Sequence, residues 1–127
     1  MRLLLDTHAF IWVLEHDPKL SAAAFAAIND PGNGVRLSVA SLWEITIKSA
    51  RGKIAFKTSW ETLLQRVGSE EGFIMPIRTE HLLALHKLPH HHRDPFDRMI
   101  AAQALAEDCA LVSQDTALDA YGVRRLW

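Results

Sequence analysis

The feature that most constrains the fold is a short apolar run, Leu3–Leu5, that ends directly on Asp6. Three consecutive leucines are typical of a strand that is buried on both faces of a parallel sheet. A helix-period pattern of apolar residues follows and closes before Asp17. Asp6 therefore lies where a strand passes into a helix. In an open α/β sheet this edge, outside the carboxyl ends of the strands, is where ligands bind.

The same alternation of apolar runs and helical patterns continues along the chain. We expect strands at 3–5, 35–39, 73–75, 110–113 and within 123–126, a short extended piece at 54–56, and helices at 7–16, 20–29, 41–51, 59–68, 79–87 and 94–107, with a short helix after 115. Strands that alternate with helices indicate an α/β fold whose parallel sheet is covered on both faces. No linker is long enough to divide the chain, so we expect one domain over 1–127.

Composition narrows the class of protein. A content of 49% hydrophobic and 23% charged residues argues against disorder. The net charge is −1, so any basic surface for a nucleic acid must be local. The single cysteine, Cys109, excludes an internal disulfide and a thiolate zinc site. No stretch has the ~20 apolar residues of a membrane span or the apolar core of a signal peptide, so we expect a cytoplasmic protein without membrane attachment.

Acidic residues recur at the expected strand-to-helix junctions. They are Asp6, Glu44, Asp97 and Asp115, with Asp94 nearby. Taken singly, each fits a role at a helix N-terminus: Asp6 and Asp115 as N-caps, and Ser41 with Glu44 as a capping box. Taken together they predict more, because the carboxyl ends of parallel strands share one edge and the acids that follow should converge there.

Converging carboxylates repel one another, and each raises the pKa of the others. A hard divalent cation relieves this repulsion, and Mg²⁺ is typically held by one or two carboxylates, waters and phosphate oxygens. The pattern predicts a Mg²⁺ or Mn²⁺ site that acts on a phosphodiester, with Asp6, Glu44, Asp97 and Asp115 as metal-binding and catalytic candidates. Asp94 ranks behind Asp97, because it precedes Pro95 and fits the helix cap.

Polar residues beside the acids have two interpretations. Thr7 and Ser113 are candidates to orient metal-bound waters, or they are turn and capping residues. Histidines 90–92 resemble a metal-binding tract, but adjacent residues in a loop rarely share one ion, so we expect a solvated loop.

Basic residues near the acids are candidates to contact RNA. Glu44, Lys48 and Arg51 are spaced to share one helical face, and Arg93 and Arg98 flank the junction at Asp97. They would contact a nucleic-acid backbone, or they form a helix-stabilising Glu–Lys pair and solvated charges.

The chain resembles a PIN-domain ribonuclease of the VapC toxin kind. The resemblance rests on four segments in the family's order, at 4–8 (LLDTH), 41–48 (SLWEITIK), 94–104 (DPFDRMIAAQA) and 112–115 (VSQD). It implies a three-layer α/β/α sandwich with a parallel sheet and a Mg²⁺- or Mn²⁺-dependent endoribonuclease that uses the same four acids. It also implies homodimers, and inhibition by a small cognate antitoxin protein that covers the active-site groove.

Two other functions use the same residues. A non-catalytic PIN-like module would bind RNA or a protein partner without cleavage. A phosphotransferase with an aspartyl nucleophile, of the haloacid-dehalogenase kind, would use Asp6, but that mechanism wants a second acid at the position of His8. Apolar surface for a protein partner would come from whichever of the four tryptophans, Trp12, Trp43, Trp60 and Trp127, the core does not absorb.

Overall fold

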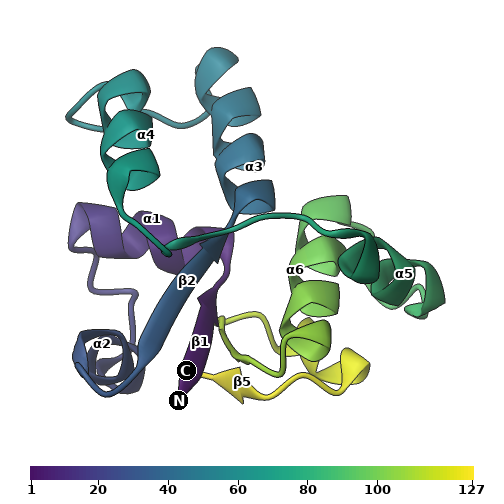
Figure 1. Ribbon diagram of the computed structural model, residues 1–127. Coiled ribbons are helices and arrows are strands. Elements are labelled where there is room, and N and C mark those ends of the chain that lie inside the picture. The colour runs from purple at the N-terminus through teal and green to yellow at the C-terminus, as the bar shows by residue number, and fades with distance from the viewer.

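The computed structural model describes all residues, 1–127, and contains one five-stranded sheet (Figure 1). The strands are β1 (Arg2–Leu5), β2 (Gly34–Ser38), β3 (Ile74–Met75), β4 (Ala110–Val112) and β5 (Arg125–Leu126). Their order in the sheet is β3-β2-β1-β4-β5, and every neighbouring pair is parallel. The carboxyl ends of all five strands therefore point to the same edge.

Helices follow the strands and cover the sheet on both faces. They are α1 (Thr7–Glu15), α2 (Ala22–Asn29), α3 (Val39–Ala50), α4 (Trp60–Ser69), α5 (Thr79–Lys87), α6 (Pro95–Ala106) and a short 3₁₀ helix, η1 (Thr116–Tyr121). In Figure 1, α1 and α2 lie on one side of β1, and α5 and α6 lie on the other. The expected α/β/α sandwich with a parallel sheet is confirmed.

The alternation of side chains along β1 explains the two-layered core. Leu3 and Leu5 belong to one apolar cluster, with Phe10 and residues of α3 and α4. Leu4 belongs to a second cluster, to which the alanine-rich helix α6 contributes four of the 11 buried residues. Because successive side chains of a strand point to opposite faces, a run of three leucines serves both layers.

The helix that carries Glu44 begins earlier than expected. Ser38, the last residue of β2, caps α3 by accepting a 3.0 Å hydrogen bond from the backbone N–H of Ala40. Ser41 consequently lies inside the helix and is fully buried, so the predicted capping box of Ser41 with Glu44 is wrong. The expected extended piece at 54–56 does not form a strand.

None of the helices combines the length and the apolar character needed to cross a bilayer.

Candidate active site

A hollow of ≈ 470 Å³ lies at the carboxyl edge of β1 and β4. Its lining residues are Asp6, His8, Trp12, His92, Asp97, Gln114, Asp115 and Thr116. Asp6 follows β1 directly, Asp115 lies three residues beyond β4, and Asp97 belongs to the first turn of α6. The structure thus brings three of the four predicted acids into one hollow. Strand direction accounts for Asp6 and Asp115, whereas Asp97 lies at a junction between two helices, α5 and α6, and not after a strand as expected.

Helix capping orients two acids of the hollow, Asp6 and Asp115, and also Asp94, and in each it uses only one carboxylate oxygen. The capping bonds run from Ala9 N–H to Asp6 Oδ1 at 2.8 Å, from Phe96 N–H to Asp94 Oδ1 at 2.8 Å, and from Ala117 N–H to Asp115 Oδ1 at 3.0 Å. In each case Oδ1 is the capping atom, so Oδ2 remains for another partner. The structural and the functional interpretations of Asp6 and Asp115 are therefore compatible.

Asp6 is the most enclosed acid of the hollow, with only 5% of its surface exposed. Burial raises the pKa of Asp6 above its ordinary value, and the nearby charge of Asp115 acts in the same direction. Hydrogen bonds from the Ser113 hydroxyl and the Ala9 amide oppose this rise. Ser113 Oγ also accepts from Asp115 N–H at 3.0 Å, so this hydroxyl holds two of the acids in place.

Asp97 is where the crowding of charge is greatest. Burial, together with the charges of Asp94, Glu44 and Asp6, raises the pKa of Asp97 to about 7, although the nearby His92 counteracts these effects. The Asp97 carboxyl therefore carries only part of its charge at neutral pH. Since hard oxygen donors are gathered here and each carboxylate disfavours the ionisation of Asp97, the residues present fit a divalent cation.

Glu44 is buried behind the hollow and does not line it. Thr7 Oγ1 donates a 2.7 Å hydrogen bond to Glu44 Oε1, and Lys48 Nζ donates one of 2.6 Å to Glu44 Oε2. The hydrogen bond with Glu44 in turn raises the pKa of Lys48. Both oxygens of Glu44 are thus engaged, while its charge still acts on Asp97.

His92 enters the site although sequence reasoning placed it in a solvated loop. Its Nε2 atom lies 3.0 Å from Asp115 Oδ2 and 3.6 Å from Asp97 Oδ2, and 20% of its side chain is exposed. The expectation was wrong because tertiary contacts fix the loop: His92 N–H donates to Tyr121 Oη at 2.8 Å. The one local signal was its position two residues before the helix cap Asp94, whose N–H donates to His92 Nδ1 at 3.1 Å.

The predicted basic residues divide into two groups. Lys48 pairs with Glu44, so the helix-stabilising interpretation describes it, and Arg98 donates to the Leu88 carbonyl at 3.0 Å. Arg51 and Arg93 have exposed side chains. Lys48 and Arg98 thus each make an internal contact, whereas no such contact engages Arg51 or Arg93.

A second cluster with metal-ligand chemistry lies away from the hollow and comprises Glu80, His81 and Glu107. His81 is fully buried, and its Nδ1 accepts from Arg78 N–H at 2.9 Å while Nε2 lies 2.8 Å from Glu107 Oε1. Because Nδ1 is an acceptor, the proton of the neutral ring is on Nε2 and is donated to Glu107. No lone pair of His81 faces the acids, so this cluster is a structural contact.

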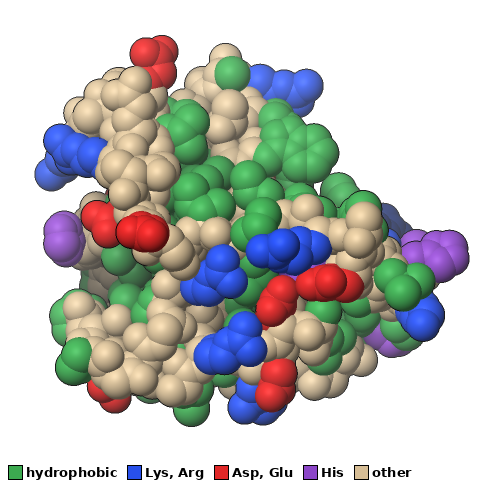
Figure 2. Space-filling model, in the orientation of Figure 1, with side chains coloured by type: hydrophobic (Ala, Val, Ile, Leu, Met, Phe, Trp, Pro, Cys, Tyr) green, Lys and Arg blue, Asp and Glu red, His purple; other side chains and the backbone are tan.

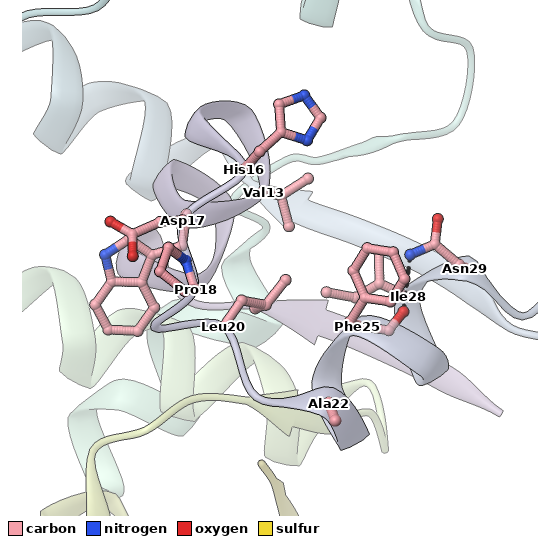
Figure 3. Close-up of a pocket in the computed structure, with 10 residues that line it drawn as sticks. Val13, His16, Asp17, Pro18, Leu20, Ala22, Phe25, Ile28 and Asn29 are labelled. Carbon is pink, nitrogen blue, oxygen red and sulfur yellow. Dashed lines mark hydrogen bonds between the residues drawn. The ribbon is translucent and has the colours of Figure 1, made fainter.

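An apolar groove of ≈ 480 Å³ lies between α1 and α2. Figure 3 shows Val13 of α1, Leu20 of the connecting turn and Phe25 of α2 directed toward the same space. Phe25 is 59% exposed, so the groove presents an aromatic ring at the surface. Trp12 lines both this groove and the acidic hollow, so the two depressions adjoin at one side chain.

Comparison with known proteins identifies the family. The PIN domain family model matches residues 3–123, whereas no curated protein matches the chain in sequence. FitAcB from Neisseria gonorrhoeae has 17% identity and a TM-score of 0.68, over 97% of this chain and 95% of that chain. The structure of VapBC2 from Rickettsia felis, bound to a DNA fragment from the VapBC2 promoter, has 14% identity to this chain. Its TM-score is 0.69, over 100% of both chains.

VapBC-1 from nontypeable Haemophilus influenzae has 19% identity and a TM-score of 0.68, over 98% of this chain and 96% of that chain. At these identities the likeness is one of fold. The match of the family model extends over nearly the whole length, from β1 to the second residue after η1. The chain belongs to the PIN domain family.

Proposed function

We propose that this protein is a divalent-metal-dependent endoribonuclease and acts as the toxin of a toxin–antitoxin pair. The observation that carries the proposal is the convergence of Asp6, Asp97 and Asp115 on one hollow at the carboxyl edge of the sheet. Membership of the PIN family supports a nuclease, since PIN domains are generally nucleases. The names of the similar structures, VapBC and FitAcB, support the assignment to a toxin–antitoxin pair.

The acids of the hollow would hold Mg²⁺ or Mn²⁺ through oxygens that capping leaves free. Such an ion, when bound, polarises the scissile phosphate and lowers the pKa of a water molecule. Asp6 and Asp115 are held in orientation by the helices that they cap. Glu44 would act without lining the hollow, through the effect of its charge on Asp97. Hydrogen bonds from Thr7 and Lys48 hold Glu44 in position.

RNA would approach over exposed cations of the elements that also carry the acids or His92. Arg93 belongs to the loop that contains His92, and Arg51 closes the helix that contains Glu44. With a net charge of −1, the protein gains affinity for a phosphate backbone only from such local contacts.

The test is cleavage of RNA by the purified protein with and without a divalent cation. Cleavage is expected with Mn²⁺ or Mg²⁺, to stop with a chelator, and to fall by at least 10²-fold in Asp6→Asn. Asp108→Asn is the matched control, because Asp108 is exposed, lies outside the hollow and has a left-handed backbone (φ 53°) that asparagine accepts. RNA binding without cleavage in any metal would instead favour the non-catalytic module.

We further propose that the antitoxin covers the apolar groove between α1 and α2. The groove needs a partner with apolar side chains, and its continuity with the acidic hollow through Trp12 would let the same partner block access to the acids. Recovery of the protein alone, after expression together with its native neighbouring gene, would contradict this partner.

We also propose that the protein forms the homodimer that its family resemblance implies, and that an exposed face of α3 is the contact surface. Hydrophobic side chains gather over α3 and its gap to α4 on the face seen in Figure 2. Trp43 of α3 is 59% exposed and Val39 is 37% exposed, and Trp43 contacts Phe96 edge-on at 5.1 Å. Trp43→Ala is expected to shift the protein toward monomer in light scattering, whereas Leu105→Ala, at an exposed position of α6, is not.

A further inference from the structure

The imidazole of His92 lies against the carboxylates of two acids of the hollow, Asp115 and Asp97. Its Nε2 atom lies 3.0 Å from Asp115 Oδ2 and 3.6 Å from Asp97 Oδ2. One ligand atom of each of the three residues lies within 4.8 Å of the other two. Asp115 Oδ2 is the oxygen that helix capping leaves free, because Oδ1 is engaged by Ala117 N–H. The ring thus occupies the side of Asp115 on which an ion bound by that oxygen and by Asp97 would be found.

The other ring nitrogen determines what His92 can offer to this position. Nδ1 accepts a 3.1 Å hydrogen bond from Asp94 N–H. A neutral imidazole has one N–H group, so an acceptor at Nδ1 places the proton on Nε2, where it is donated to Asp115. An Nε2 atom that carries a proton has no lone pair for a metal. In this arrangement His92 is a hydrogen-bond donor to the acids and not a ligand beside them.

The backbone around His92 is anchored as well. The N–H groups of His91 and His92 donate to Tyr121 Oη at 3.2 and 2.8 Å, and Tyr121 is buried, with 8% of its surface exposed. The His91 ring also lies against the Tyr121 ring, with the ring centroids 5.4 Å apart. The loop before α6 therefore presents the His92 ring to the acids from a fixed backbone.

We propose that His92 is a built-in competitor of the divalent cation, and that its ring must leave Asp115 and Asp97 before an ion binds through their Oδ2 atoms. The inference rests on the proposed function, since it concerns the same site. It follows that His92 lowers the affinity for the ion and keeps the site closed to it at low ion concentration.

The experiment is a titration of the full-length protein with Mn²⁺ alone, without RNA, in which electron paramagnetic resonance measures free Mn²⁺. The variant is His92→Asn. Its amide oxygen can still accept from Asp94 N–H, as Asp17 Oδ1 does from Lys19 N–H at the same spacing, but the side chain is too short to reach Asp115. The backbone contacts to Tyr121 are unchanged, so the loop is expected to keep its position. His90→Asn is the matched control, because His90 is exposed in the same loop and does not line the hollow.

His92→Asn is expected to bind Mn²⁺ with a Kd about ten-fold lower than that of the wild type, which corresponds to about 1.4 kcal/mol at 25 °C. His90→Asn is expected to bind as the wild type does. Equal affinity of His92→Asn and the wild type would overturn the inference and leave the nuclease proposal intact. Weaker binding would overturn it in another way, by showing that His92 is a metal ligand. Absence of Mn²⁺ binding in all three proteins would overturn the metal site itself, and this inference with it.

Discussion

Thr7 Oγ1 and Glu44 Oε1 are joined by a 2.7 Å hydrogen bond in the buried interior, although 37 positions separate them in the sequence. The contact ties the first turn of α1 to α3 directly behind the acidic hollow. When a buried carboxylate loses a hydrogen-bond donor, its desolvation is no longer offset and the free energy of unfolding falls. The Thr7–Glu44 pair therefore contributes to the stability of the fold and also fixes Glu44 beside the site.

Thr7→Val is expected to destabilise the protein by roughly 1–3 kcal/mol, because it leaves Glu44 Oε1 buried without its hydroxyl donor at nearly unchanged side-chain volume. Urea denaturation measures the change. Thr79→Val, at the exposed first residue of α5, is expected to change the free energy of unfolding by less than about 0.5 kcal/mol. Equal effects of the two substitutions would show that the Thr7–Glu44 bond contributes nothing.

Asp97→Asn is expected to make the ion-free protein more stable at pH 8, by roughly 1–3 kcal/mol. The pKa of Asp97 is about 7 in the folded state, against about 3.9 in an unfolded chain, so the native state binds more protons between these values. Stability contributed by the protonated carboxyl is therefore fully present below pH ~4 and is lost as the pH rises through about 7. Thermal unfolding at pH 4 and pH 8, in a chelator, measures this difference. The stabilising effect of Asp97→Asn should largely vanish at pH 4, and a constant difference at both values would contradict the assigned pKa.

Mn²⁺ is expected to stabilise the folded protein, because the ion binds the converged acids of the native state and not the unfolded chain. At a free concentration 100-fold above Kd the gain is about 2.7 kcal/mol. Thermal unfolding with Mn²⁺ and after removal of the ion by a chelator measures it. Asp6→Asn and Asp97→Asn should lose most of the gain, whereas Asp108→Asn should keep it. A similar gain in all variants would mean that the ion binds elsewhere.

Phe25→Ser is expected to weaken binding of the antitoxin by at least ten-fold, because it removes the most exposed aromatic ring of the α1–α2 groove. Calorimetric titration with the purified partner measures the affinity. Ala26→Ser, at the neighbouring exposed position of α2, is the control, since Ala26 does not line the groove. An unchanged affinity of Phe25→Ser would place the partner on another surface.

Much of the fold could be predicted because its signals are local. Three leucines in succession require a strand with two buried faces, and the alanines of α6 permit its close packing on the sheet. The convergence of Asp6 and Asp115 followed from the direction of β1 and β4, whereas Asp97 follows α5 and reaches the hollow through the position of α6. Their roles in metal binding and catalysis stay predictions.

The remaining features depend on contacts between distant segments. Helix α3 begins earlier than predicted because Ser38 caps it. The predicted cap, Ser41, instead contacts Thr7 in the interior. Glu44 lies behind the hollow because Thr7 and Lys48 engage both of its oxygens. His92 reaches the acids because the hydroxyl of Tyr121 anchors its loop, and no pattern around His92 encodes that contact.

Asp6 and Asp115 each cap a helix and also line the acidic hollow, and this determines which substitutions can remove the activity without loss of the fold. Each carboxyl group secures the start of a helix through one oxygen, so replacement by alanine removes a cap as well as a charge and costs about 1 kcal/mol of stability. Asparagine keeps an oxygen for the cap while it removes the charge. A lineage that discards the activity but retains the fold is therefore expected to carry asparagine at these two positions more often than any apolar residue.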